Sequence, residues 1–221
     1  MTGVVLVPGA FHGGWWYAPL VQRLQALGHV AVPVTPGGLE QEPCLDRPIT
    51  LDTHIQDALD AIPAGNERDV VLVGHSYGGS IISGVADAVP DRVRALVYLD
   101  AFVPEDGDSA WTMTNDWERQ WYVDGARRTG YAVDPLPFFD DRARPHPIAT
   151  LLQASRLTGA WRQVPSKTYA VALDWPGGSP LQQSVDKVRA DPQFVVHDWQ
   201  TRHNVMHDGP DRVLDLLTDL L

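Results

Sequence analysis

Short runs of apolar, β-branched residues alternate along the chain with longer stretches that carry apolar residues at helical spacing. Most of the short runs are apolar at successive positions, which is typical of strands covered on both faces of a parallel sheet. The predicted strands are 3–7, 29–34, 69–74, 94–100, 167–174 and 193–199, and the predicted helices are 17–27, 51–62, 80–89 and 211–221. This alternation predicts an α/β fold, with a doubly wound, mostly parallel sheet of about six strands.

One segment breaks the alternation. Between Val103 and Pro165 no strand is evident, and the segment carries several prolines and four tryptophans. A loop of about sixty residues without structure is uncommon inside a compact domain. We interpret 103–165 as a mostly helical cap inserted into a core made of 1–102 and 166–221. The alternative is a surface insertion whose aromatic residues fill a small core of their own.

Composition and charge narrow the class of protein. The 221 residues favour one domain, and the net charge of −11 argues against nucleic acid or an anionic membrane surface as partner. The single cysteine, Cys44, rules out an intrachain disulfide and fits a cytoplasmic location. The apolar run at the start stops at Pro8 with no basic segment before it, so no signal peptide is expected. No apolar run is long enough to predict a membrane helix.

The predicted strand 69–74 leads into the turn Gly74-His75-Ser76-Tyr77-Gly78 and then into a helix. This strand–turn–helix context is typical of a nucleophile elbow, which exposes a serine hydroxyl at a sharp turn. Gly74 and Gly78 lack the Cβ atoms that would collide with the neighbouring helix and strand. The alternative is a glycine-rich turn with an incidental serine.

A serine needs a base, and the base needs an acid that fixes its tautomer. His203 follows the last predicted strand and precedes the last helix, so it is the preferred base, with His207 as the fallback. Two aspartates end predicted strands before it. Asp174 is the preferred acid and Asp100 the alternative, whereas Asp198 lies too close to His203 along the chain. Asp174 could also be only a turn residue.

An oxyanion hole in this arrangement takes one N–H from the residue after the nucleophile and one from the loop after the first strand. The predicted donors are the backbone N–H groups of Tyr77 and Ala10, with Gly9 letting the backbone come close.

With these residues placed, the chain resembles the α/β-hydrolase superfamily, in the branch of plant methyl esterases, hydroxynitrile lyases and small bacterial esterases. The resemblance rests on VLVPGAFHGGWW, GHSYGG, LVYLDAFVPEDG, RLTGAW and RHNVMHDGPDRV. It implies that His203 is the catalytic histidine. Pro8 stands where the family has its first loop histidine, and the usual leading hairpin is expected to be reduced or absent. The family's acid follows the penultimate strand with a slightly different spacing, which leaves Asp100 open.

The resemblance implies a serine esterase, and two alternatives stay open. Hydroxynitrile lyases carry a threonine in place of Gly9 and a lysine in place of Asn204, and the absence of both argues against a lyase. A non-catalytic receptor of the same fold would bind a small ligand under the cap.

The expected partner is a small molecule of apolar or aromatic character, a small to medium ester or a lactone. Phe11, His12, Trp111, Trp121 and Trp161 are the candidate substrate-binding residues, although His12 could instead hold its loop by hydrogen bonds. No metal-ligand spacing and no nucleotide fingerprint is evident, so no metal and no cofactor is expected. The closing helix could pack on its own sheet or on a second copy, so a homodimer stays open.

Overall fold

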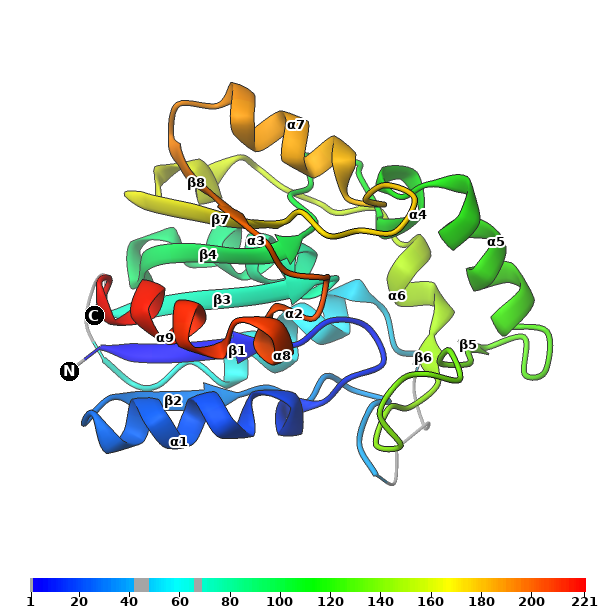
Figure 1. Cartoon of the computed structure of the whole chain (residues 1–221), viewed down its shortest axis with the longest axis horizontal. Helices are drawn as coiled ribbons and strands as arrows, with labels where there is room; N and C mark the ends of the chain where they lie inside the picture. Colours follow the sequence, from blue (N-terminus) through cyan, green and yellow to red (C-terminus); the bar gives the residue numbers. More distant parts are fainter. Residues whose placement is uncertain (1, 42–47, 66–68) are drawn as a thin grey trace.

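The computed structural model describes residues 2–41, 48–65 and 69–221, so Cys44 lies outside the described residues. Its centre is a six-stranded sheet in the order β2-β1-β3-β4-β7-β8, in which every neighbouring pair is parallel (Figure 1). The strands are β1 (Gly3–Val7), β2 (Val30–Pro33), β3 (Val70–Ser76), β4 (Val93–Ala101), β7 (Ser166–Ala172) and β8 (Phe194–Trp199). The predicted doubly wound parallel sheet is therefore confirmed.

Helices cover both faces of this sheet. One core packs the sheet against α2 (Leu51–Asp60), α3 (Gly78–Ala88) and α7 (Gln182–Ala190). The other packs it against α1 (Ala18–Ala26), α8 (Val205–Asp208) and α9 (Pro210–Thr218). In β1, Val5 and Val7 belong to the first core and Val4 and Leu6 to the second. Because successive strand residues point to opposite faces, a strand buried on both sides needs an apolar residue at every position.

The closing helix α9 packs on its own sheet. Val213 and Leu217 are fully buried in the second core, and the helix contacts α1. Its apolar face is thus used within the chain, and the homodimer stays a prediction.

The segment 103–165, called the insertion below, leaves the sheet after β4 and returns at β7. It contains α4 (Ala110–Met113), α5 (Asp116–Gly125), α6 (Ile148–Leu152) and a two-stranded antiparallel pair, β5 (Ala132–Val133) with β6 (His146–Pro147). Figure 1 shows these elements together at one end of the sheet. Strands of two residues are too short to leave a pattern in the sequence, so this pair was not predicted.

The last part of the insertion lies against the core. The 3₁₀ turn η3 (Ala160–Gln163) packs on α3, where the backbone N–H of Trp161 donates to Asp87 at 3.1 Å. Two further 3₁₀ turns, η1 (Gly14–Tyr17) and η2 (Pro90–Arg92), precede α1 and β4.

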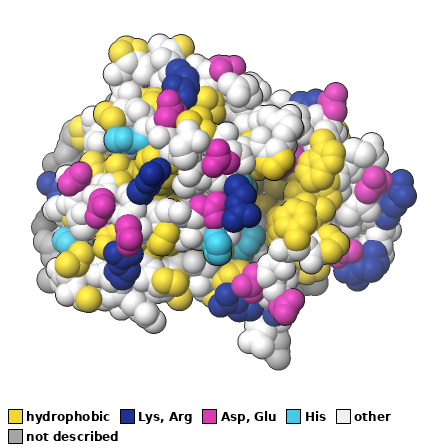
Figure 2. Space-filling model, in the orientation of Figure 1, with side chains coloured by type: hydrophobic (Ala, Val, Ile, Leu, Met, Phe, Trp, Pro, Cys, Tyr) yellow, Lys and Arg dark blue, Asp and Glu magenta, His cyan; other side chains and the backbone are white. Residues whose placement is uncertain are grey.

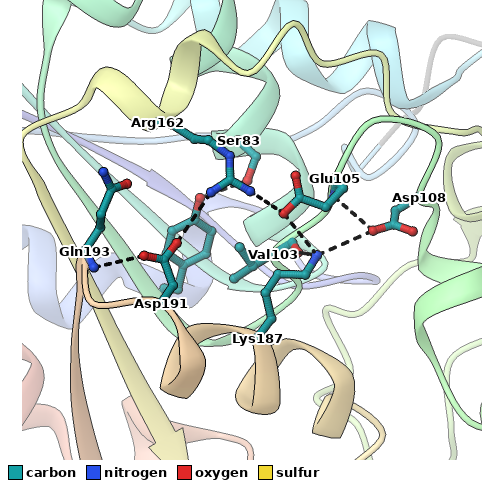
Figure 3. A network of polar contacts seen from close by, with 9 residues as sticks. Ser83, Val103, Glu105, Asp108, Arg162, Lys187, Asp191 and Gln193 are labelled. Atoms are coloured by element: carbon teal, nitrogen blue, oxygen red, sulfur yellow. Dashed lines mark hydrogen bonds and ion pairs between the residues drawn. The ribbon is translucent and has the colours of Figure 1, made fainter.

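An ion-pair network joins both ends of the insertion to the core (Figure 3). Arg162 pairs with Glu105 at 2.6 Å and with Asp191 at 3.4 Å. Lys187, on α7, lies 3.6 Å from Glu105 and 3.5 Å from Asp108. A shared network restrains each side chain through more than one partner, so it holds geometry better than an isolated surface pair.

We expect Arg162→Met to lower the free energy of unfolding by about 0.5–1 kcal/mol, because the network is only partly exposed. The loss should shrink in 1 M NaCl, where charges are screened over about 3 Å. Urea unfolding at low and high salt measures both effects. Arg23→Met removes the exposed pair with Asp211 and is the matched control. An equal loss in both variants, or no salt dependence, would contradict the stabilising role of the network.

Candidate active site

Three residues at the ends of strands or in the loop after β1 have an unusual backbone. Phe11, Ser76 and Asp100 have φ values of 70°, 52° and 44°, and no other non-glycine residue that the structure describes has a positive φ. Such conformations cost about 1–3 kcal/mol each and persist where the surroundings enforce them. Strained conformations of this kind cluster at functional sites. Phe11, Ser76 and Asp100 lie near one another at the same end of the sheet.

Ser76 is the last residue of β3, and α3 begins two residues later. The predicted glycine contacts are confirmed. A Cβ on Gly74 would lie 2.7 Å from the carbonyl carbon of Gly78, and one on Gly78 would lie 2.5 Å from the carbonyl oxygen of Val7. A Cβ on Gly79 would come within 2.2 Å of the oxygen of Phe102. The helix therefore packs directly on the strand backbones, which makes the turn at Ser76 sharp.

His203 lies in the loop after β8, and its Nδ1 is 2.7 Å from Oδ2 of Asp100. Because a carboxylate only accepts, Nδ1 carries the proton, and Nε2 of the neutral ring is left as a base. Asp100 is fully buried near the end of β4 and also accepts from the N–H of Ala172 at 3.2 Å and from Nε1 of Trp175 at 2.8 Å. Three donors thus compensate the buried carboxylate.

The preferred acid of the sequence analysis, Asp174, does not contact His203. Strand β7 ends at Ala172, so Asp174 lies in the loop beyond it, where it is exposed and its N–H donates to the carbonyl of Thr201. Asp100 is buried near the end of β4, which is the neighbour of the serine strand β3. Of the two candidate acids, Asp100 is the one that hydrogen-bonds to His203.

The other candidates are paired elsewhere. Nδ1 of His207 bonds to Asp208 at 2.8 Å, and the His207 side chain is 73% exposed. Asp198 pairs with Arg189 on α7. Neither interacts with Asp100, so the fallback histidine and the weaker acid stay outside this group.

His75 supports His203 through the main chain. Its Nε2–H donates to the carbonyl of His203 at 2.9 Å, and its ring stacks on Trp16 with a centroid distance of 4.4 Å. Burial, followed by the nearby His203, holds the pKa of His75 well below its usual value. His203 is thus held at both its ring and its backbone.

The loop after β1 lies against the serine turn. A Cβ on Gly9 would be 2.8 Å from Nδ1 of His75 and 3.0 Å from Cβ of Ser76, so only glycine fits there without a shift. His12 donates from Nδ1 to the carbonyl of Ala10 at 2.7 Å, which is the loop-holding role considered for it. Neither the N–H of Ala10 nor that of Tyr77 donates to another group within the described ranges.

A cavity of about 710 Å³ opens in front of Ser76 and His203. Of the candidate substrate-binding residues, Phe11, His12 and Trp121 line it. Trp111 and Trp161 do not line it. Trp111, on α4, packs against the core. Trp161 is buried beside α3, because η3 packs on that helix.

The inner wall of the cavity is aromatic. Phe11 stacks on Trp121 at 4.9 Å and meets the edge of Phe139 at 5.5 Å. Two large side chains at the rim, Trp117 and Phe138, are 62% and 78% exposed. Figure 2 shows hydrophobic side chains gathered beside a hollow on this side of the molecule, next to histidine side chains. The cavity therefore favours an apolar or aromatic guest.

Two residues of the site were not found from the sequence. Trp175 and His146 become neighbours of the site only through tertiary contacts, and no local motif marks them. Within the described part of the chain, no group of three or more metal-ligating residues is found, and no helix is long and apolar enough to cross a membrane.

Residues 4–216 match the model of the alpha/beta hydrolase family. A carbendazim hydrolyzing esterase from Nocardioides sp. (strain SG-4G) is 33% identical over the whole of both chains. An alpha-hydroxynitrile lyase and methylesterase 2, both from Arabidopsis thaliana, are 34% and 32% identical, each over 46% of this chain and 40% of its own length. An extracellular alpha/beta-hydrolase of a Paenibacillus species shares the fold, with a TM-score of 0.78 and 22% identity over 100% of this chain and 99% of its own.

We expect Gly78→Ala to lower the free energy of unfolding by roughly 2–3 kcal/mol, since its Cβ would be forced against the backbone of β1. The matched control is Gly84→Ala in the same helix, whose Cβ would meet only the Ile55 side chain. That side chain can turn away, and alanine gains about 1 kcal/mol of helix propensity, so the loss should be smaller. Urea unfolding compares the two, and equal losses would contradict the close backbone packing.

Proposed function

We propose that this chain acts through an acyl-enzyme formed on Ser76. The chain belongs to the alpha/beta hydrolase family, and its full-length similarity to an esterase marks it as a carboxylic ester hydrolase. Its substrates would be small to medium carboxylic esters or lactones. The observation that carries the proposal is the 2.7 Å hydrogen bond between His203 and the buried Asp100, beside a cavity that Ser76 also lines.

In acylation, Ser76 Oγ attacks the ester carbonyl while Nε2 of His203 takes its proton. Asp100 keeps the proton of the ring on Nδ1 and stabilises the imidazolium that forms. The N–H groups of Ala10 and Tyr77 would donate to the oxyanion, and each such donor typically contributes about 10²–10³ in rate. His203 then returns the proton to the leaving alcohol, and the acyl group stays on the serine.

In deacylation, water enters the place of the alcohol. Nε2 of His203 removes a proton from the water as it attacks the acyl carbonyl, and the same two N–H groups would hold the second oxyanion. The proton then passes to Ser76 Oγ as the carboxylic acid leaves. Acid and base roles are thus exchanged on one histidine.

Trp175 supports Asp100 in this scheme. It donates from Nε1 to the same carboxylate oxygen that His203 contacts, and its ring lies 4.7 Å from the His203 ring. Asp100 is fully buried, and the low dielectric of a buried position strengthens its attraction to the imidazolium.

The aromatic wall formed by Phe11, Trp121 and Phe139 favours substrates with a flat apolar group. Stacking on such rings contributes about 0.5–1.5 kcal/mol beyond burial of area. The rim residues Trp117 and Phe138 extend the same apolar surface outward. The full-length relative is a carbendazim hydrolyzing esterase, so carbendazim is one compound to test beside simple aromatic esters.

A lyase reaction is less well supported. The threonine of hydroxynitrile lyases would stand at Gly9, where a Cβ would press on His75 and Ser76. Their lysine would stand at Asn204, which here accepts from the N–H of His207 and caps α8. No cation at position 204 is then available to stabilise departing cyanide.

We expect wild-type protein to hydrolyse p-nitrophenyl acetate and butyrate, and Ser76→Ala to lose this activity. Asp100→Asn should lower kcat by about 10⁴-fold, because the ring would be held in the wrong tautomer. Asp174→Asn is the matched control and should stay within about 3-fold, since Asp174 is exposed and away from His203.

A large loss in Asp174→Asn with little change in Asp100→Asn would reverse the choice of acid. No wild-type turnover, together with no labelling of Ser76 by a fluorophosphonate, would refute the hydrolase and favour a ligand-binding protein of the same fold.

The proposed substrate class is tested at the aromatic wall. We expect Trp121→Leu to lower kcat/KM for methyl benzoate about 10-fold more than for methyl butyrate, because only the benzoate ring stacks. Trp111→Leu, the same exchange outside the cavity, should leave the ratio of the two values unchanged. A Trp121→Leu variant with an unchanged ratio would place the aromatic preference elsewhere.

A further inference from the structure

His146 is a fully buried histidine in β6 of the insertion, and the proposed reaction does not use it. Its Nδ1 accepts the backbone N–H of Phe11 at 3.1 Å, across 135 positions of the chain. Phe11 directly follows Ala10, the proposed oxyanion donor. The insertion thus reaches the loop through one buried hydrogen bond.

The partners of His146 determine its tautomer. Thr150 Oγ1 donates to the carbonyl of Pro147 at 2.7 Å, so it accepts from Nε2–H of His146 at 2.8 Å. Nδ1 therefore carries no proton and is free to accept from Phe11. Burial, with smaller effects from His54 and His12, holds the pKa of His146 well below its usual value. The ring stays neutral at pH 7, as an acceptor requires.

The same peptide unit is held from its other side. The peptide that joins Ala10 to Phe11 donates its N–H to His146 and accepts at its C=O from His12 Nδ1 at 2.7 Å. One residue on, the carbonyl of Phe11 accepts from the N–H of Arg144 at 2.9 Å. These three contacts fix the loop at Phe11, whose φ of 70° is unfavourable for a side chain with a Cβ.

We propose that His146 is a positioning residue for the oxyanion hole, which clamps the Ala10–Phe11 peptide so that the N–H of Ala10 faces the oxyanion. The inference rests on the proposed function. Without an acceptor at residue 146, the N–H of Phe11 would be buried and unpaired, and Phe11 would relax toward negative φ. That rotation would turn the neighbouring peptide and misdirect the N–H of Ala10.

The test compares two nearly isosteric substitutions. The side-chain oxygen of asparagine can take the place of Nδ1, so His146→Asn keeps the acceptor, whereas His146→Leu removes it. We expect His146→Leu to lower kcat for p-nitrophenyl butyrate about 10–100-fold with KM within about 3-fold, because the oxyanion exists only in the transition state. His146→Asn should recover most of that kcat.

A second readout separates positioning from a loss of structure. A trifluoromethyl ketone adds to a serine nucleophile and forms an oxyanion in place of the ester's transition state. Its affinity should weaken in His146→Leu by the same factor as kcat/KM. The urea midpoints of the wild type and both variants report separately whether the substitution has affected folding. Equal kcat in the Leu and Asn variants, or a KM effect alone, would overturn the proposal. Loss of wild-type turnover or of fluorophosphonate labelling would instead refute the proposed function itself.

A measurement on the wild-type enzyme needs no variant. In protein labelled with ¹⁵N-histidine, His146 should be neutral at pH 7, with its proton on Nε2 and a hydrogen-bonded Nδ1. A ring protonated on Nδ1 at this pH could not accept from Phe11 and would overturn the proposal, whatever the variants show.

Discussion

Helix α3 lies so close to the backbones of β1 and β4 that no side-chain carbon fits at Gly78 or Gly79. This close approach determines much of the site. It forces the chain at Ser76 into a sharp turn and brings the start of α3 directly behind the serine. The N-terminus of a helix carries partial positive charge, so the same packing favours negative charge where an oxyanion would form. The cost is the strained backbone of Ser76, which the surrounding core must offset.

The proposed catalytic group spans several strands of the sheet. Ser76 ends β3, Asp100 lies near the end of the adjacent β4, and His203 follows β8 at the sheet edge. The histidine therefore reaches over β7 to meet the aspartate, and Trp175, in the loop after β7, fills the space and donates to the same carboxylate. The donors of His203, Ala172 and Trp175 compensate the buried carboxylate and fix its orientation toward the imidazole.

Two buried neutral histidines, His146 in the insertion and His54 on α2, hold groups beside the proposed catalytic serine. His146 accepts from the loop after β1, and His54 accepts from the hydroxyl of Tyr77, the residue after the serine. Burial lowers the pKa of His54 to about 4, so this ring is also neutral at pH 7. Each ring is oriented by a second hydrogen bond on its other nitrogen. The insertion thus supplies Trp121 and Phe139 of the aromatic wall and also, through His146, restrains the backbone of the loop after β1.

The parallel sheet followed from the amino-acid sequence alone, since continuous apolar runs require burial on both faces. The serine turn followed from it too, since only glycines tolerate that backbone approach. It also indicated His203 from its place after the last strand. The choice between Asp100 and Asp174 depended on which strand end lies within hydrogen-bond reach of His203, and both residues look alike along the chain. The positions of Trp111, Trp161 and His146 relative to the cavity depended on how the insertion folds back on the core. Such contacts join residues far apart in sequence, so they become visible only in the folded chain.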